Sequence, residues 1–270
     1  MDTVAPQPTA DQRAASELLW RHWQEQRRLP ALPERLRPRS RGEGYAIQAL
    51  LHERDAAPLF GWKIAATSPA GQAHIGVDGP LAGRILASRV VAAGGTVPFG
   101  RNHMRVAEVE VAFRLGRTLP PRAEPYGVDE VLDAVGSVHP AIEVPDSRYD
   151  DFVAAGAPQL IADNACAHWF VLGAPATAPW RTLDLAALET RGTVSGRDPV
   201  LGRGGNVLGD PRAALAWLVN EVSGLGLPLR AGEVVTTGTT TVPLAIAPGD
   251  AVTADLGPLG TVTMRLGPEE

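Results

Sequence analysis

The chain has 270 residues, and its content of 44% hydrophobic and 20% charged residues suits one large domain or a domain with a small cap. The formal net charge of −5 leaves no basic footprint, so we expect no nucleic-acid partner. The N-terminus lacks the basic start and apolar core of a signal peptide, and no apolar run reaches membrane-spanning length. The single cysteine, Cys166, excludes an intrachain disulfide framework and predicts a reducing, cytoplasmic location.

The first part of the chain predicts helices. Two capping-box signals, in which Thr or Ser is followed three residues later by Gln or Glu, predict helices over residues 9–28 and 40–54. A strand-like run follows at residues 61–67. Ser68 and Pro69 then predict a short helix, because proline is favoured at the first helical position. Together these elements predict a small N-terminal layer.

The remainder of the chain reads as mainly β. Short strand-like runs alternate with Gly and Pro turns, and helices are predicted only over residues 128–135 and 210–222. No regular β-α-β alternation is present, which argues against a doubly wound parallel sheet. We therefore predict an α+β fold with a curled, mixed β core. The predicted division is an N-terminal helical or α+β region of residues 1–84 and a β-rich catalytic core of residues 85–270.

Three acidic residues lie in apolar runs. Glu108 and Glu110 are two residues apart, so they point to the same face of a strand, and Glu143 has a similar setting. Like charges buried side by side are unfavourable, and a bound divalent cation would relieve both the repulsion and the cost of burial. Three carboxylates without Cys or His favour a hard ion such as Mg2+ or Mn2+. The alternative is an exposed strand whose solvated face carries the glutamates.

Lysine is almost absent from the chain. Of the 25 lysines and arginines, Lys63 is the sole lysine, and it lies in the strand-like run at residues 61–67. A position that stays lysine in an arginine-rich chain favours a role for a compact charge whose pKa can be tuned. The alternative is a lysine that extends from a strand end to solvent.

Other polar residues admit more than one interpretation. Asp163 and Asn164 interrupt an apolar stretch, where they can cap a turn or present polar groups to a ligand. Cys166 has no obvious base beside it, which argues against a catalytic thiol. Asp78 lies in a Gly-rich turn, where aspartate commonly serves as a turn former. The Gly-rich run at residues 202–209 lacks the P-loop pattern and predicts a loop.

The chain carries an ordered set of short motifs that resembles the 2-keto-4-pentenoate hydratase (2-hydroxypenta-2,4-dienoate hydratase) family, within the fumarylacetoacetate hydrolase superfamily. The likeness covers about residues 40–266, and the order of the motifs makes it specific. The motifs are Gly61-Trp62-Lys63-Ile64, Gly76-Val77-Asp78-Gly79-Pro80, Glu108-Val109-Glu110, Pro140-Ala141-Ile142-Glu143, Ala162-Asp163-Asn164-Ala165, Gly232-Glu233-Val234-Val235-Thr236-Thr237-Gly238 and Ala247-Pro248-Gly249-Asp250.

The resemblance implies a mixed β-roll core with a small helical N-terminal region. It implies that Mg2+ or Mn2+ is held by Glu108, Glu110 and Glu143, with Lys63 and Asp78 beside the metal as catalytic residues. The implied reaction is the addition of water to a small 2-hydroxy-dienoate or its 2-oxo-enoate tautomer, which gives a 4-hydroxy-2-oxo acid. The implied assembly is a homo-oligomer.

The resemblance further implies that Asp163, Asn164 and Cys166 contact the substrate. Cys166 stands where such hydratases often carry serine, and a thiol is a weaker hydrogen-bond donor. Two alternatives stay open. The first is a decarboxylase of a 2-oxo-3-enedioate (oxalocrotonate type), whose second carboxylate would need a cation such as Arg148 or Arg203. The second is a non-catalytic subunit that pairs with a related decarboxylase.

Overall fold

The computed structural model describes residues 7–269, so the first six residues, which belong to the signal-peptide prediction, lie outside it. The helices are α1 (Ala10–Gln24), α2 (Arg41–Ala49), α3 (Leu51–Arg54), α4 (Pro69–His74), α5 (Val128–Asp133), α6 (Ala157–Ala162) and α7 (Pro211–Gly224). The strands are β1 (Leu59–Ala65), β2 (Leu81–Leu86), β3 (Val90–Ala92), β4 (Thr96–Val97), β5 (Val106–Leu115), β6 (Val135–Val144), β7 (Trp169–Leu172), β8 (Glu189–Val194), β9 (Val200–Arg203), β10 (Val234–Thr239), β11 (Leu244–Ala245), β12 (Ala251–Asp255) and β13 (Thr261–Leu266).

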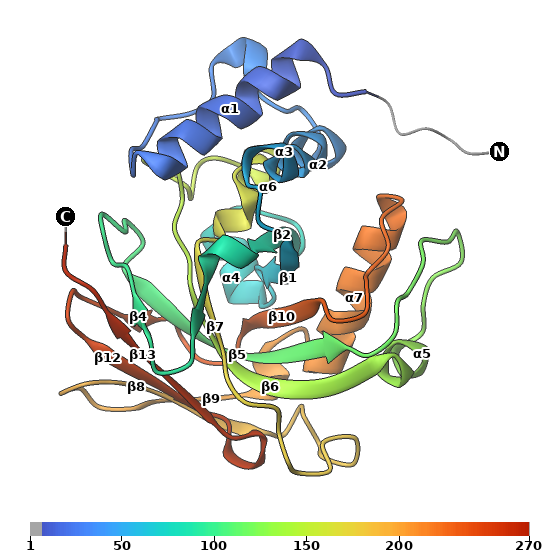
Figure 1. Cartoon of the computed structure of the whole chain (residues 1–270), viewed down its shortest axis with the longest axis vertical. Helices are drawn as coiled ribbons and strands as arrows, with labels where there is room; N and C mark the ends of the chain where they lie inside the picture. Colours follow the sequence, from blue (N-terminus) through green and yellow to red (C-terminus); the bar gives the residue numbers. More distant parts are fainter. Residues whose placement is uncertain (1–6, 270) are drawn as a thin grey trace.

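Two curled sheets form the centre of the molecule (Figure 1). The larger sheet has the order β2-β1-β10-β5-β6-β7-β3, with β11 added to β5, and it mixes parallel and antiparallel pairs. The smaller sheet has the order β4-β13-β12-β8-β9. Helices α1, α2 and α3 lie together at one end (Figure 1). The predicted α+β fold with a curled mixed sheet and a helical N-terminal region is confirmed.

Alternation along β5 and β6 gives the larger sheet two different faces. One face carries Val109, Val111 and Phe113, and it packs against residues of the smaller sheet such as Val252 and Met264 in the main hydrophobic core. The opposite face carries the three glutamates singled out in the sequence. The main core therefore packs against one face of β5 and β6, and the three acids lie on the opposite face of the same two strands.

The predicted helix starts are confirmed, whereas the ends differ: α5 ends at Asp133 and α7 at Gly224, each two residues from the predicted end, and α6 was not predicted. Thr9 forms the expected reciprocal capping box, and Ser40 accepts a hydrogen bond from the backbone of Glu43. The first helix ends at Gln24, because Gln26 adopts a left-handed backbone conformation with φ of 49°. The second is divided at Leu50, whose N–H bonds three residues back to Ile47 rather than four.

Side chains cover the outer edge of β2, which is the end strand of the larger sheet. The N–H of Ala82 donates to the Tyr45 hydroxyl, and the Gln48 amide donates to the Ala82 carbonyl. The Asn164 side chain both accepts from the Arg84 N–H and donates to the Arg84 carbonyl, as a neighbouring strand would. An open edge that would otherwise pair with another strand is thereby satisfied within the chain.

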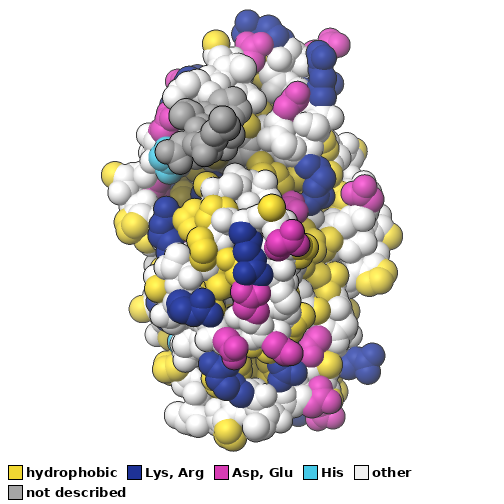
Figure 2. Space-filling model, turned by 90° about the vertical axis from the view of Figure 1, so that its right-hand side faces the viewer, with side chains coloured by type: hydrophobic (Ala, Val, Ile, Leu, Met, Phe, Trp, Pro, Cys, Tyr) yellow, Lys and Arg dark blue, Asp and Glu magenta, His cyan; other side chains and the backbone are white. Residues whose placement is uncertain are grey.

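The predicted division between residues 84 and 85 stays a prediction. It falls within β2, which pairs with β1, and β1 in turn pairs with β10 of the core. Among residues 7–269 no helix is long and apolar enough to cross a membrane. On the face shown in Figure 2, basic and acidic side chains are interspersed rather than gathered by sign.

Candidate metal centre

The three glutamates meet on one face of the larger sheet. Glu108 of β5 lies directly opposite Glu143 of β6 in the antiparallel register, and Glu110 follows two residues along on the same face. One oxygen from each carboxylate lies within 4.8 Å of the others. Glu110 is fully buried and Glu143 is 2% exposed, whereas Glu108 is half-buried. The alternative of a solvated strand face is wrong, because two of the three acids are inaccessible to water.

Buried carboxylate oxygens without partners mark the centre of this cluster. Glu110 Oε1 and both oxygens of Glu143 accept no hydrogen bond within the described chain. The other oxygen of Glu110 accepts from the Thr236 hydroxyl and, at 3.0 Å, from the Gly238 N–H, so its orientation is fixed. Buried oxygens of Glu110 and Glu143 that accept no hydrogen bond, converging with the Glu108 carboxylate, fit a hard divalent cation, whose preferred ligands are carboxylate oxygens.

The electrostatics of the cluster also favour a cation. Burial, together with the charge of Glu108, raises the pKa of Glu110 to about 7. Burial raises the pKa of Glu143 well above its usual range, although Lys63 opposes the shift, and burial likewise raises the pKa of Glu108. Without a cation the cluster therefore takes up protons near neutral pH, whereas a bound dication would keep the carboxylates ionised.

Lys63 lies beside the glutamates and is almost fully buried. Its ammonium is 3.1 Å from Glu143 Oε1, an ion pair without hydrogen-bond geometry, and it donates to the Ala165 carbonyl at 3.0 Å. Burial lowers the pKa of Lys63, but the charges of Glu143 and Glu108 outweigh that effect and raise it. Lys63 is therefore a fixed positive charge here, and its pKa is shifted upward by the neighbouring carboxylates.

A left-handed turn over residues 164–166 lies next to Lys63. Asn164, Ala165 and Cys166 all have positive φ values, 56°, 50° and 61°, which cost roughly 1–2 kcal/mol per residue outside glycine. The hydrogen bonds of Asn164 to β2 and of Lys63 to Ala165 hold this turn. Gly83 gives it room, because a Cβ at that position would lie 2.5 Å from the Asn164 carbonyl oxygen.

Asp163, just before this turn, is committed to a buried ion pair with Arg148. Its carboxylate accepts hydrogen bonds from the Arg148 guanidinium, from the Arg148 N–H at 3.0 Å and from the Ser147 hydroxyl at 2.7 Å. The side chains of Asp163 and Asn164 thus position the turn through protein partners, and neither lines the cavity described below. Their direct contact with substrate stays a prediction.

A cavity of about 1070 Å³ opens in front of the glutamates. Lys63, Glu108 and Cys166 line its inner part. Burial, aided by the charge of Asp163, raises the pKa of Cys166 to about 12, which favours the neutral thiol. The apolar wall consists of Ile75, Leu81, Met104, Val106, Phe152 and Leu160.

Neutral polar groups complete the cavity wall. Gln72, Asn206 and Thr241 line it, and the buried hydroxyl of Thr241 has no hydrogen-bond partner in the described chain. Asn206 belongs to the Gly-rich run at residues 202–209, so that predicted loop supplies part of the wall. No sequence pattern singles out these residues as part of one site, because they reach the cavity from three separate segments.

Three predicted residues lie outside the cavity lining. Asp78 is exposed in the turn after α4, so its catalytic role stays a prediction. Arg148 is 2% exposed and bonded to Asp163, and Arg203 is exposed at the end of β9. Neither arginine is therefore placed in this structure to receive a second carboxylate in the cavity.

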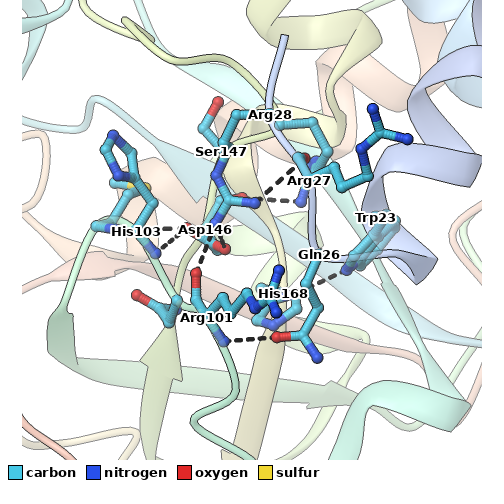
Figure 3. A network of polar contacts seen from close by, with 12 residues as sticks. Trp23, Gln26, Arg27, Arg28, Arg101, His103, Asp146, Ser147 and His168 are labelled. Carbon is cyan, nitrogen blue, oxygen red and sulfur yellow. Dashed lines mark hydrogen bonds and ion pairs between the residues drawn. The ribbon is translucent and has the colours of Figure 1, made fainter. Parts of the chain in front are cut away.

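A separate network attaches the N-terminal helix to the segment behind the cavity (Figure 3). Trp23 of α1 donates its indole N–H to His168 at 2.7 Å, and Arg28 forms an ion pair with Asp146 at 2.5 Å. Asp146 also accepts from the His103 N–H at 2.9 Å. Because Asp146 follows Pro145, which lines the cavity, this network fixes one side of the site.

Comparison with known proteins assigns this arrangement to a family. The family model described as "Fumarylacetoacetate (FAA) hydrolase C-terminal" matches residues 82–266, which hold the three glutamates. The chain belongs to the fumarylacetoacetate hydrolase family. The match begins within β2 and ends at the last residue of β13, so it spans most of both sheets of this family member.

Named relatives within this family fall into two groups. The chain is 34% identical over 223 residues to a 2-keto-4-pentenoate hydratase of Paraburkholderia xenovorans, which covers 82% of this chain and 81% of the relative. It is 35% identical over 228 residues to a 4-oxalocrotonate decarboxylase of a Pseudomonas species, which covers 82% and 85%. A solved 4-oxalocrotonate decarboxylase of Pseudomonas putida G7, complexed with magnesium and adipate, aligns with a TM-score of 0.85 and 27% identity over 94% of this chain and 97% of that chain.

Proposed function

We propose that this family member is a metal-dependent hydratase, a carbon–oxygen lyase that adds water to a 2-hydroxy-2,4-dienoate to give a 4-hydroxy-2-oxo acid. One observation carries the choice. Apart from Lys63 beside the glutamates, no lysine or arginine of residues 7–269 lines the cavity, and His74, which also lines it, is exposed to solvent. A substrate with one carboxylate and an uncharged tail fits such a cavity, whereas a dicarboxylate would leave its second charge without a cation. The named hydratase relatives support the same choice.

Glu108, Glu110 and Glu143 would hold Mg2+ or Mn2+, as the convergence of their carboxylates and the buried oxygens of Glu110 and Glu143 without hydrogen bonds suggest. When bound, the ion would act as a Lewis acid for negative charge on the substrate C2 oxygen. Thr236 and Gly238 keep Glu110 in its ligating orientation. Lys63 stays charged, so it can pair with the C1 carboxylate and orient the substrate at the glutamates.

The proposed reaction moves two protons and one hydroxyl group. The C2 hydroxyl loses its proton and C5 gains one, which gives a 2-oxo-3-enoate; water then adds its hydroxyl to C4 and a proton to C3. The unpartnered Thr241 hydroxyl is the group on the cavity wall that we propose holds the attacking water. The prediction that Asp78 carries a proton or orients the water is kept as a part of the proposal to be tested.

Finer assignments belong to the same proposal. We propose a role in aromatic catabolism, a homo-oligomeric assembly that can associate with a related decarboxylase, and a cytoplasmic location. The first two rest on the family resemblance of the sequence motifs, and the buried free thiol of Cys166 supports a reducing compartment. Mg2+ is supported by the magnesium complex of the solved relative, and Mn2+ shares its preference for oxygen ligands.

The test is the loss of ultraviolet absorbance of freshly generated 2-hydroxypenta-2,4-dienoate with Mg2+ or Mn2+, with the product identified by mass. We expect metal-dependent gain of one water, abolished in Glu108→Ala. Glu189→Ala, which removes an exposed strand glutamate, is the matched control and should keep full activity. Release of carbon dioxide from 4-oxalocrotonate without dienoate hydration would instead identify a decarboxylase.

A further inference from the structure

We propose that the physiological substrate carries an apolar substituent, such as an alkyl or phenyl group, on C5 of the dienoate. This inference rests on the proposed hydratase function and specifies its substrate class. The first observation is the size of the cavity. The cavity of about 1070 Å³ lies at the upper end of the roughly 300–1000 Å³ typical of sites for drug-sized ligands. A five-carbon dienoate is far smaller than such a ligand and would leave most of the space to water.

The residues of β5 that line the cavity indicate the direction in which a C5 substituent of the substrate would extend. Glu110, Glu108 and Val106 alternate onto one face of this strand, and a strand rises about 3.3 Å per residue. Glu110 is fully buried and does not line the cavity, whereas Glu108 and Val106 both do. The cavity therefore extends from the glutamates toward Val106. A substrate held by its C1 and C2 oxygens at the glutamates would direct C5 to the region of Val106.

The chemistry of the wall in this direction is apolar. Met104 and Val106 come from the start of β5, Phe152 and Leu160 from the segment that includes α6, and Ile75 from the end of α4. Among residues 7–269 no lysine or arginine lines this part, and its one basic ring, the exposed imidazole of His74, packs against Phe152 with ring centroids 6.1 Å apart. An apolar substituent would lose its contact with water here, which favours binding by about fourfold per buried methylene. A carboxylated substituent would find neither lysine nor arginine to pair with.

The experiment compares dienoates that carry hydrogen, methyl or phenyl on C5, using the metal-loaded full-length protein. We expect kcat/KM to rise in that order, with the phenyl compound at least roughly 10-fold above the parent. Calorimetric binding of the unreactive acids 2-oxopentanoate and 2-oxo-5-phenylpentanoate gives a second readout, with the phenyl acid expected to bind at least roughly 10-fold more tightly.

Val106→Phe should lower the ratio of phenyl to parent kcat/KM, because the larger side chain occupies the space for the tail. Val128→Phe makes the same change on α5, where Val128 is 39% exposed and outside the cavity, and should leave the ratio unchanged. Turnover of the parent with no gain for the phenyl compound in either readout would overturn this inference alone. If no dienoate reacts, the proposed hydratase function and this inference both fail.

Discussion

Two groups of buried acidic residues, Asp163 on the one hand and Glu110 with Glu143 on the other, differ in their surroundings. Around Asp163 every charge has a partner, because the carboxylate accepts bonds from Arg148 and Ser147. Around Glu110 and Glu143 three carboxylate oxygens accept no hydrogen bond within the described residues, and Lys63 is the cation that forms an ion pair with Glu143. Both groups are almost inaccessible to water, so burial alone does not separate them. The difference teaches that Asp163 belongs to a self-sufficient structural pair, whereas the glutamates need a ligand that the chain does not supply.

Arg148→Met would break the self-sufficient pair and gives the largest expected effect on stability. We expect the free energy of unfolding to fall by roughly 3–5 kcal/mol, because Asp163 would remain buried without its partner. Denaturant unfolding followed by circular dichroism measures this change. The double variant Arg148→Met with Asp163→Asn should recover part of the loss. Equal stabilities of the single and double variants would contradict the proposed structural role of the pair.

In the metal-free protein, the buried glutamates should make the stability of the fold depend on pH. The pKa of Glu110 is about 7 in the folded chain, above its ordinary value of 4.5, so the folded state binds the additional proton between these values. Stability of the metal-free protein should therefore fall as pH rises from about 4.5 to 7, by on the order of a few kcal/mol. Thermal unfolding in the presence of a chelator measures this.

Two controls sharpen the pH prediction. Glu110→Gln removes the titrating group, so the fall attributed to it should disappear while the metal-free protein becomes more stable at neutral pH. Saturating Mg2+ should stabilise the wild type more at pH 8 than at pH 5, because binding requires ionised carboxylates. If the stability of the metal-free wild type instead rises steadily from about pH 4.5 to 7, the folded glutamate cluster does not bind the additional proton described above.

Thr236→Val tests whether the Thr236 hydroxyl holds Glu110 in position for metal binding, and it gives the smallest expected effect. The change keeps the side-chain shape but removes the hydroxyl that donates to Glu110, leaving the Gly238 N–H as its donor. We expect the dissociation constant for Mg2+ to increase by roughly 10- to 100-fold. Thr237→Val is the matched control, because that buried hydroxyl donates to the Val111 carbonyl and not to a glutamate. Equal metal affinity in both variants would refute the positioning role of Thr236.

The sequence by itself predicted the α+β class, the helix starts and the meeting of three glutamates. These features follow from short-range rules: Thr9 caps its helix through neighbouring residues, and Glu108 and Glu110 share a face because strand side chains alternate. The ordered motifs also predicted the family. Helix ends were less certain, since the left-handed Gln26 had no sequence signature.

Only the tertiary structure decided what each polar residue does. The sequence makes Asp163 and Asn164 candidate ligand-binding residues, and only the fold shows that their side chains bond to Arg148 and to the backbone of β2. The charge of Lys63 is likewise set by carboxylates on β5 and β6, which outweigh its burial. Local patterns specify periodicity and caps, whereas burial, pKa and cavity shape depend on groups distant in sequence, so no local pattern encodes them.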